Sequence, residues 1–394
     1  MRSWTSRRLL TGDPDVNPRG NLAVVYQRPV EDPYSGGSGH MRGFVAELRK
    51  HIPVDVVAPR YLHEGPRPPP DTLITSVSNI LRSTLCGVRF ALQQAVRPRK
   101  QRTRAIVFFD IYGAPVPFVW ARVTGTPVVY YAQDLGEDIL RAFRSQGYRG
   151  SALLRWLRGP FERLLLRKAA LVVAVSDEMT QAMVSRGHAR DRVLTCSMQR
   201  ARPAVDLDAV REWQRRFDLE RRIGIVFLGN LNYPPNRTAA EFVTSDLRPK
   251  SSQLAERAVF LLVGKGSEPF SSESEPPVHG LGPVSDLSNL LFACHIGLAP
   301  MEVAGGVSGK MVDYLIHGLR VVATPDGARG AVASDAITVC SKDRFAEVLG
   351  ALVAAGARGR PGYLNPVDPR VAETYLEGGE FRRLVAVLER IAPP

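Results

Sequence analysis

The sequence predicts an α/β protein made of two doubly wound Rossmann-like domains that face each other across a cleft. Short apolar runs, typical of buried parallel strands, alternate with helical patterns along most of the chain. The alternation stops in a polar stretch at residues 201–222 and then starts again. With 394 residues, the chain is also too long for one ordinary hydrophobic core. We therefore expect a flexible tail at 1–20, a first domain at 21–205, a second domain at 206–375 and a final helix at 376–394.

The first series opens as a βαβ unit in which a glycine-rich loop, SGGSGHMRG from Ser35 to Gly43, joins a strand to a helix. Buried strands are indicated by continuous apolar runs, and helices by apolar residues at helical spacing. The expected strands are 22–29, 54–59, 105–110, 127–134, 171–176 and 192–198. The expected helices are 44–52, 77–96, 115–125, 151–169 and 177–187.

The second series repeats this pattern from residue 224. Asn236 is the expected N-cap of its first helix, because a short polar side chain there can accept a bond from the helix start. The last helix, at 380–391, has no predicted partner and suits either domain. The expected strands include 224–229, 258–263, 296–300 and 336–340, and the expected helices 235–243 and 343–356.

Several protein classes are excluded at the level of sequence motifs. The four cysteines are far apart and form neither a zinc motif nor a disulfide framework, which suits a reducing cytoplasm. The N-terminus lacks the apolar core of a signal peptide, and no uncharged run reaches the roughly 18 residues of a membrane span. P-loop, zinc-protease and serine-hydrolase motifs are missing. We expect a cytoplasmic protein that needs neither a metal nor a cofactor.

Positive charge is concentrated in the first half of the chain. Residues 1–200 contain 30 Lys and Arg residues against 16 Asp and Glu residues, hence +14, whereas the whole chain carries +13. Such asymmetry is typical of a domain that faces a polyanion such as nucleic acid, anionic lipid or a phosphorylated substrate. The alternative is an arginine-rich surface without a special partner.

The segment GGVSGKMVDYLIHGLRVVATPDGARG, from Gly305 to Gly330, carries the strongest chemical pattern. Its glycines allow backbone N–H groups to approach an anion, and the next helix is expected to start near Ser308 or Gly309. Lys310 adds a positive charge, and Asp313 lies one turn further on the same face. This pattern suits a nucleoside diphosphate, with phosphates at the helix start and ribose at Asp313. The alternative is an ordinary surface ion pair between the two side chains.

That segment resembles the donor-binding signature of GT-B glycosyltransferases of group 1, in a family 4-like form. Further stretches resemble the family in the same order along residues 20–335. They are YSGGSGHMRGFVAELRKHIPVDVVAP, LVVAVSDEMTQAMVSRG, VFLGNLNYPPNRTAAEF, VFLLVGKGSEPF and VHGLGPVSDLSNLLFACHIGLAP. The resemblance implies transfer of a sugar from a nucleotide-diphosphate donor, with the acceptor bound by the first domain.

The resemblance also implies roles for individual residues. Asp313 stands where the family has the glutamate that binds the donor ribose. Lys310 and the backbone of Val307, Ser308 and Gly309 would hold the diphosphate. The remaining donor contacts would come from Gly229 and Asn230 beside the phosphates, Gly282 in the nucleobase loop 280–284, and Gly36, Gly37 and Gly39 over the donor phosphate. Many relatives have a basic residue at the position of Asn230.

The sequence departs from the family at a second carboxylate. Retaining members carry Glu-x7-Glu, but Gly305 stands eight residues before Asp313, and Glu302 comes three residues too early. Retaining and inverting courses therefore both stay open. An inverting enzyme needs a base, for which Asp134 is the first candidate and Asp110 the second, since both end strands of the first domain.

Other roles are equally open at this stage. His40 in the glycine loop is a candidate contact to donor or acceptor, or a plain loop residue. The segment 149–168 mixes six cations with Leu, Trp and Phe, which suits an anionic membrane surface and a lipid-linked saccharide acceptor in cell-surface polysaccharide synthesis. Its alternative is a helix with leucines in the core and arginines in water. Two other functions stay open. A nucleotide-sugar epimerase of the same fold would need more acidic residues in the cleft, and a basic nucleic-acid-binding protein would need a binding motif that the sequence does not contain.

Overall fold

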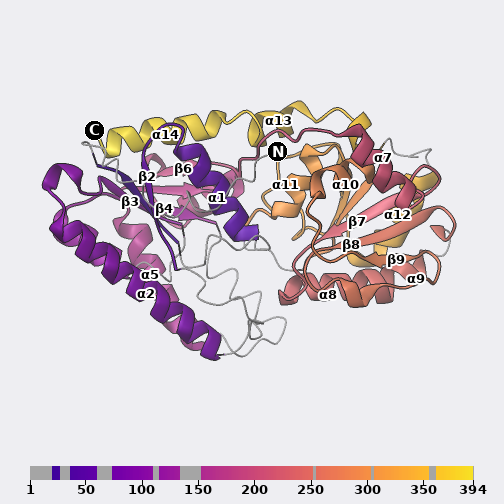
Figure 1. Cartoon of the computed structure of the whole chain (residues 1–394), viewed down its shortest axis with the longest axis horizontal. Coiled ribbons are helices and arrows are strands. Elements are labelled where there is room, and N and C mark those ends of the chain that lie inside the picture. The colour runs from indigo at the N-terminus through magenta and orange to yellow at the C-terminus, as the bar shows by residue number, and fades with distance from the viewer. Residues whose placement is uncertain are drawn as a thin grey trace. The chain divides into compact units, whose positions relative to one another are not determined.

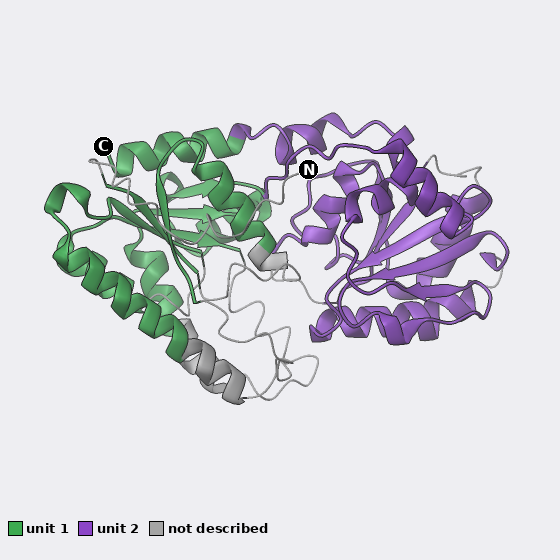
Figure 2. Ribbon diagram, in the orientation of Figure 1, with its two compact units in different colours: residues 1–197, 380–394 green, residues 198–379 purple. Residues whose placement is uncertain are grey.

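The chain folds into two compact units, each built on one parallel six-stranded sheet. The computed structural model describes residues 20–26, 36–59, 73–109, 115–133, 152–251, 254–302, 306–354 and 361–393. Unit 1 comprises residues 1–197 and 380–394, and unit 2 comprises residues 198–379 (Figure 2). The prediction of two doubly wound α/β domains is confirmed.

The sheet of unit 1 has the strand order β2-β1-β3-β4-β5-β6, with every neighbouring pair parallel. Most of its residues are buried, as expected for a parallel sheet that helices cover on both faces. The strands are β1 (Leu22–Val25), β2 (Val54–Val57), β3 (Ala105–Phe108), β4 (Val128–Ala132), β5 (Leu171–Ala174) and β6 (Val193–Thr195).

Helices cover the two faces of this sheet in two groups. The chain moves one way from β1 to β2 and the opposite way from β2 onward, so right-handed crossovers place α1 on one face and the helices between β2 and β6 on the other. The described helices are α1 (Gly36–Leu48), α2 (Leu73–Val96), α3 (Pro115–Thr124), α5 (Ala152–Lys168), α6 (Asp177–Ser185) and α14 (Gly379–Ile391), with short 3-10 turns η2 (Arg99–Gln101) and η3 (Arg190–Arg192). Figure 1 shows α1 and α14 on one side of the sheet, and α2 and α5 on the other.

The structure corrects one expectation for unit 1 and resolves a second that the sequence left open. The glycine-rich stretch is not a loop, because helix α1 already begins at Gly36. Burial of Met41 and His40 in the core stabilises this turn despite the low helix propensity of glycine. The last helix has a definite partner, since Phe381 of α14 packs edge-to-face on Phe44 of α1 at 5.6 Å between ring centroids.

The boundary between the units lies after Ser197 and not after residue 205. Met198 belongs to a hydrophobic core of unit 2, and the backbone N–H of Arg200 donates to the carbonyl of Tyr375 at 2.8 Å. The chain therefore joins unit 2 at Met198, before helix α7 (Leu207–Arg216) begins.

The sheet of unit 2 has the strand order β12-β11-β10-β7-β8-β9, again all parallel. Two hydrophobic cores lie around this sheet and its helices. The strands are β7 (Ile223–Leu228), β8 (Ala258–Val263), β9 (Val278–Gly280), β10 (Ile296–Ala299), β11 (Arg320–Ala323) and β12 (Ile337–Val339). The helices are α7 (Leu207–Arg216), α8 (Pro234–Phe242), α9 (Arg248–Lys250), α10 (Leu287–Ala293), α11 (Gly309–Ile316), α12 (Phe345–Ala354) and α13 (Pro369–Tyr375), with the π-helical segment η4 (Val243–Leu247) and 3-10 turns η6 (Glu268–Phe270), η7 (Lys342–Arg344) and η8 (Gly362–Leu364).

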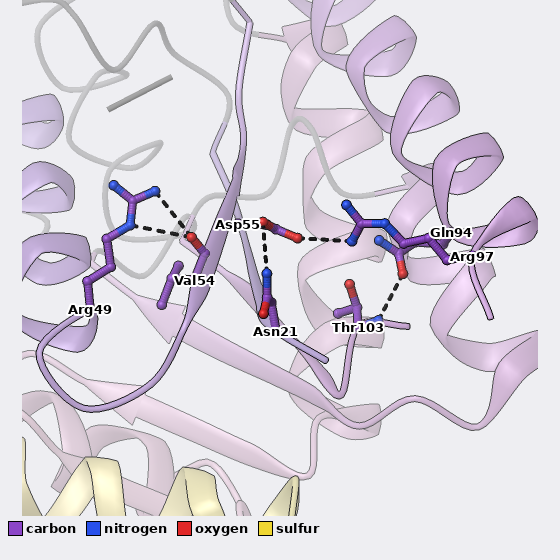
Figure 3. Close-up of polar contacts among 7 residues, drawn as sticks. All are labelled: Asn21, Arg49, Val54, Asp55, Gln94, Arg97 and Thr103. Atoms are coloured by element: carbon purple, nitrogen blue, oxygen red, sulfur yellow. Dashed lines mark hydrogen bonds and ion pairs between the residues drawn. The ribbon is translucent and has the colours of Figure 1, made fainter. Parts of the chain in front are cut away.

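A polar cluster fixes the C-terminal end of α2 to the amino-terminal edge of the first sheet (Figure 3). The Asp55 carboxylate accepts from Asn21 Nδ2 and from Arg97 Nη1, each at 3.2 Å. Gln94 of α2 is buried, and its Oε1 accepts from the backbone N–H of Thr103 at 2.8 Å. These bonds determine which side of α2 faces the protein.

None of the described helices is both long enough and apolar enough to cross a membrane. Within the same residues, no group of three or more His, Cys, Asp or Glu side chains is arranged to hold a metal ion.

Candidate functional site

The candidate site in unit 2 is built where β7 and β8 end and α11 begins. Gly229 and Gly264 follow the two strands and lie so close that a β-carbon on Gly264 would come within 2.0 Å of the Gly229 carbonyl oxygen. Gly264 also has a φ of +130°, which side chains other than glycine rarely adopt. Glycine at these positions lets the two strand ends form one edge.

The loop after Gly229 folds back on itself through two asparagines. Asn236 Nδ2 donates to the carbonyl of Asn230 at 3.1 Å, and a β-carbon on Gly229 would lie 2.9 Å from Asn236 Cγ. Asn236 was expected as a helix N-cap, but α8 begins at Pro234, with Tyr233 in the cap position. The side chain of Asn236 is thereby free to point at α11.

Lys310 lies in the first turn of α11 and contacts this loop. Its Nζ donates to Asn236 Oδ1 at 2.9 Å, lies 3.3 Å from Met301 Sδ and is 4.4 Å from the ring centroid of Phe227. All three partners are uncharged. Burial accordingly lowers the pKa of Lys310 to about 7.

Asp313, one turn further along α11, is held by Arg200. The Nε of Arg200 donates to Asp313 Oδ1 at 2.9 Å, and both side chains stay about a quarter exposed. The guanidinium also lies over the helix start, since a β-carbon on Gly309 would be 3.4 Å from Arg200 Nη2. Lys310 and Asp313 thus have different partners, which argues against the simple ion pair between them.

Tyr314 fixes the position of α11 relative to the strands of the sheet. Its hydroxyl accepts from the backbone N–H of Leu228 at 2.8 Å and lies 3.2 Å from the carbonyl of Leu298. Gly297 makes room for the ring, because a β-carbon there would lie 2.5 Å from it. Helix α11 begins at Gly309 after Ser308, as the sequence predicted.

The arrangement is suited to hold an anion. The N–H of Met311 donates to the Ser308 carbonyl at 3.0 Å, so the N–H groups of Gly309 and Lys310 before it form the positive end of the helix dipole. Lys310 belongs to this turn, and the guanidinium of Arg200 approaches it from another segment of the chain. A carboxylate, Asp313, stands one turn away, where it can accept from hydroxyl groups.

The remaining predicted residues of unit 2 lie near this edge or have structural partners. The backbone N–H of Gly282 donates to Ser267 Oγ at 2.8 Å, and its φ of +64° and the nearby Glu268 side chain explain the glycine. Glu302 forms a 3.0 Å ion pair with Lys342. Gly305 lies outside the described residues.

The predicted residues of unit 1 belong to a separate body of the molecule. Gly36, Gly37 and Gly39 lie in the first turn of α1. His40 follows them and is 3% exposed, with its Nε2 at 3.1 Å from the hydroxyl of Tyr131. The expected bases Asp134 and Asp110 lie outside the described residues.

Sequence reasoning missed three contributors: Arg200, Asn236 in its contact with Lys310, and Tyr314. Arg200 and Asp313 are 113 residues apart in the sequence, and no local pattern predicts the ion pair between them. From the sequence, Asn236 is expected as a helix N-cap, because it stands at the start of a helical pattern, and nothing in that pattern indicates its contact with Lys310.

Comparisons with known proteins cover most of the chain. The family profile "Glycosyl transferase 4-like domain" matches residues 35–198, and the profile "Glycosyl transferases group 1" matches residues 222–355. No curated protein matches the chain.

Several solved structures share the fold at low sequence identity. Sucrose-phosphate synthase from Thermosynechococcus elongatus has a TM-score of 0.72 and 14% identity, over 95% of this chain and 99% of that one. HepE from Anabaena, in complex with UDP-glucose, has a TM-score of 0.62 and 14% identity, over 94% and 99%. The trehalose 6-phosphate synthase of Burkholderia multivorans has a TM-score of 0.57 and 12% identity, over 95% and 99%.

Proposed function

Because the chain belongs to the group 1 glycosyltransferases and has their GT-B fold, we propose that it moves a sugar from a nucleoside-diphosphate sugar to a saccharide acceptor. The observation that carries the proposal is the start of α11, where the positive helix end, Lys310 and Arg200 surround one turn and Asp313 follows. HepE has been crystallised with UDP and UDP-glucose, which supports a donor of that class.

Each donor group has a proposed partner in unit 2. Lys310, Arg200 and the backbone of residues 307–309 hold the diphosphate, and Asp313 accepts from the ribose hydroxyls. Asn230 stands where many relatives have a basic residue, and Arg200 offsets that missing charge from another segment. Gly229 and the loop 280–284 complete the donor site toward phosphate and base.

The reaction breaks the bond between the sugar C1 and the diphosphate oxygen and forms a bond from C1 to an acceptor hydroxyl oxygen. The hydroxyl proton passes to a base, for which Asp134 is our candidate, and the cations stabilise the charge on the departing diphosphate. No metal is required in this scheme. The glycines at 36, 37 and 39 are the proposed contacts from unit 1, whereas His40 is buried behind them and supports this helix start.

We propose a lipid-linked saccharide as the acceptor, in a peripheral enzyme that makes cell-surface polysaccharide. Part of the predicted basic segment supports membrane contact. At the end of α5, Leu165 is buried in the core, whereas Leu164, Arg163 and Arg167 are exposed. Leu165 therefore fits the alternative of a helix with its leucines in the core, whereas the exposed Leu164 beside two arginines fits the membrane-binding hypothesis.

The test is sugar transfer from a panel of labelled UDP-, GDP- and ADP-sugars to a bacterial lipid extract. We expect transfer from one nucleotide class, and loss of at least about tenfold in rate in Lys310→Ala and Asp313→Ala, the scale of a lost charged contact. Lys250→Ala and Asp208→Ala, exposed in the same unit, are matched controls. A new nucleotide-sugar epimer formed without acceptor, or no turnover of any donor, would contradict the proposal.

A further inference from the structure

Helix α2 exposes its apolar face to solvent and packs its more polar face against the protein. The side chains that face the protein are Ser83, Gly87, Phe90 and Gln94, of which only one is large and apolar. The opposite face exposes Leu81, Leu85, Val88, Leu92 and Val96, at 40% to 84% of their surface. An amphipathic helix on a soluble core has the reverse arrangement.

The orientation of α2 is fixed by specific contacts. Gln94 and Arg97 bind the edge of the sheet through Thr103 and Asp55 (Figure 3). Gly87 lies against α3 so closely that a β-carbon would be 2.9 Å from the Pro117 ring. A rotation that buried the leucines would break these contacts, so the exposed stripe is a property of the fold.

The apolar stripe of α2, formed by its five exposed leucine and valine residues, continues over the neighbouring helices α3 and α5. Helix α3 packs on α5 through the edge-to-face rings of Phe118 and Phe161, at 5.5 Å between centroids. In the described part of unit 1, every exposed large apolar side chain belongs to α2, α3 or α5: besides the five of α2, these are Val119, Val123 and Leu164. Apolar surface gathered on one layer marks an interaction site.

The charge around the stripe is of one sign. From Leu73 to Arg104 the chain has no acidic residue and seven basic ones, Arg82, Arg89, Arg97, Arg99, Lys100, Arg102 and Arg104, of which Arg97 is paired with Asp55 of β2. Along α5, a surface hollow of about 580 Å³ is lined by further cations, Arg163, Arg167, Lys168 and Arg186. A partner of this layer therefore combines apolar surface with negative charge.

Resting on the peripheral membrane location of the proposed function, which α5 alone supports there, we propose that the whole α2–α3–α5 layer of unit 1 binds the surface of an anionic lipid bilayer. Leucine and valine enter the boundary between headgroups and acyl chains, and the flanking arginines pair with lipid phosphates. A second copy of the chain fits less well, because it would place Arg82 and Arg89 opposite the same basic helix. Nucleic acid would use aromatic stacking, but the stripe contains only aliphatic side chains.

The test measures co-sedimentation of the full chain with vesicles, without donor or acceptor, so that its outcome is independent of sugar transfer. The vesicles contain phosphatidylcholine alone or mixed with phosphatidylglycerol. We expect binding to the anionic vesicles, reduced at least about tenfold in Leu85→Ser/Leu92→Ser. Arg82→Gln/Arg89→Gln should lose the preference for anionic lipid. Both pairs are exposed, so circular dichroism and the melting temperature should stay unchanged.

The matched control is Leu207→Ser/Leu364→Ser, which removes two exposed leucines from unit 2 and should bind as the wild type. Equal weak binding to both vesicle types would overturn the proposal, as would wild-type binding by the Leu85→Ser/Leu92→Ser protein. If the wild type is a dimer, and Leu85→Ser/Leu92→Ser is a monomer that still binds vesicles, the stripe binds a second copy of the chain instead. Loss of duplex DNA binding in the arginine variant, without any vesicle binding, would assign it to nucleic acid.

Discussion

Donor binding should depend on pH through Lys310. Within the described part of the free protein, its ammonium contacts Asn236, Met301 and Phe227, none of which titrates, and burial lowers its pKa to about 7. A bound diphosphate places negative charge beside it and favours the protonated form. The complex therefore takes up protons, and affinity falls as the pH rises above 7.

The size of the effect follows from the two pKa values. If the diphosphate restores the ordinary value of 10.5, nucleotide affinity should fall about 15-fold between pH 7 and pH 8.5. At pH 7 the free lysine is about half protonated, so binding should take up roughly half a proton. Below pH 6 the lysine is charged in both states, and its contribution to the pH dependence ends.

Isothermal titration calorimetry in two buffers of different ionisation enthalpy measures both the affinity and the proton uptake. The control is Lys310→Arg, whose guanidinium stays charged over this range and should give a flat profile. An affinity that is constant from pH 7 to 8.5 in the wild type would refute the reasoning. A slope equally steep in Lys310→Arg would refute it too, because the titrating group would then be another one.

Three further predictions concern single side chains around the same sheet. Arg200→Ala should weaken nucleoside-diphosphate binding by about tenfold or more, the scale of a charge-assisted bond, and more than it weakens the nucleoside; equal loss for both would show that Arg200 only positions Asp313. Gly297→Ala should lower the free energy of unfolding in urea by about 1–3 kcal/mol, because its methyl group meets the Tyr314 ring at 2.5 Å; an unchanged midpoint would show that α11 can shift without cost. His295 is buried and accepts from the N–H of Gly224, and burial lowers its pKa from 6.5 to about 4. As the pH falls below 6.5, His295 is protonated in the unfolded chain before it is protonated in the folded one, so the free energy of unfolding decreases by about 2 kcal/mol from pH 7 to pH 5. In His295→Gln this part of the pH dependence should be missing. The same pH dependence in His295→Gln and in the wild type would contradict the role of His295.

The sequence was sufficient for the two sheets, because buried parallel strands are short apolar runs separated by helical patterns. It was also sufficient for the helix start at Gly309, where small residues precede an apolar face. It misplaced the start of α1, because three glycines at 36, 37 and 39 indicate a loop locally, whereas burial of Met41 and His40 stabilises a helix.

Contacts between distant segments lay beyond sequence reasoning. Arg200 is one of many arginines in the chain, and only the fold brings it to Asp313. The same holds for α2, whose spacing announces an apolar face but not the direction in which that face points. Its outward orientation follows from Gln94 and Arg97, which bind groups before β3 and in β2.

The central claim is that the start of α11 binds the diphosphate of a nucleotide donor, and a calorimetric titration with UDP, GDP and ADP tests it most directly. We predict that one nucleoside diphosphate binds the wild type, that the matching monophosphate binds more weakly, and that Lys310→Ala reduces diphosphate affinity by at least about tenfold while Lys250→Ala does not. Binding of none of the three, or equal affinity in wild type and Lys310→Ala, would contradict it.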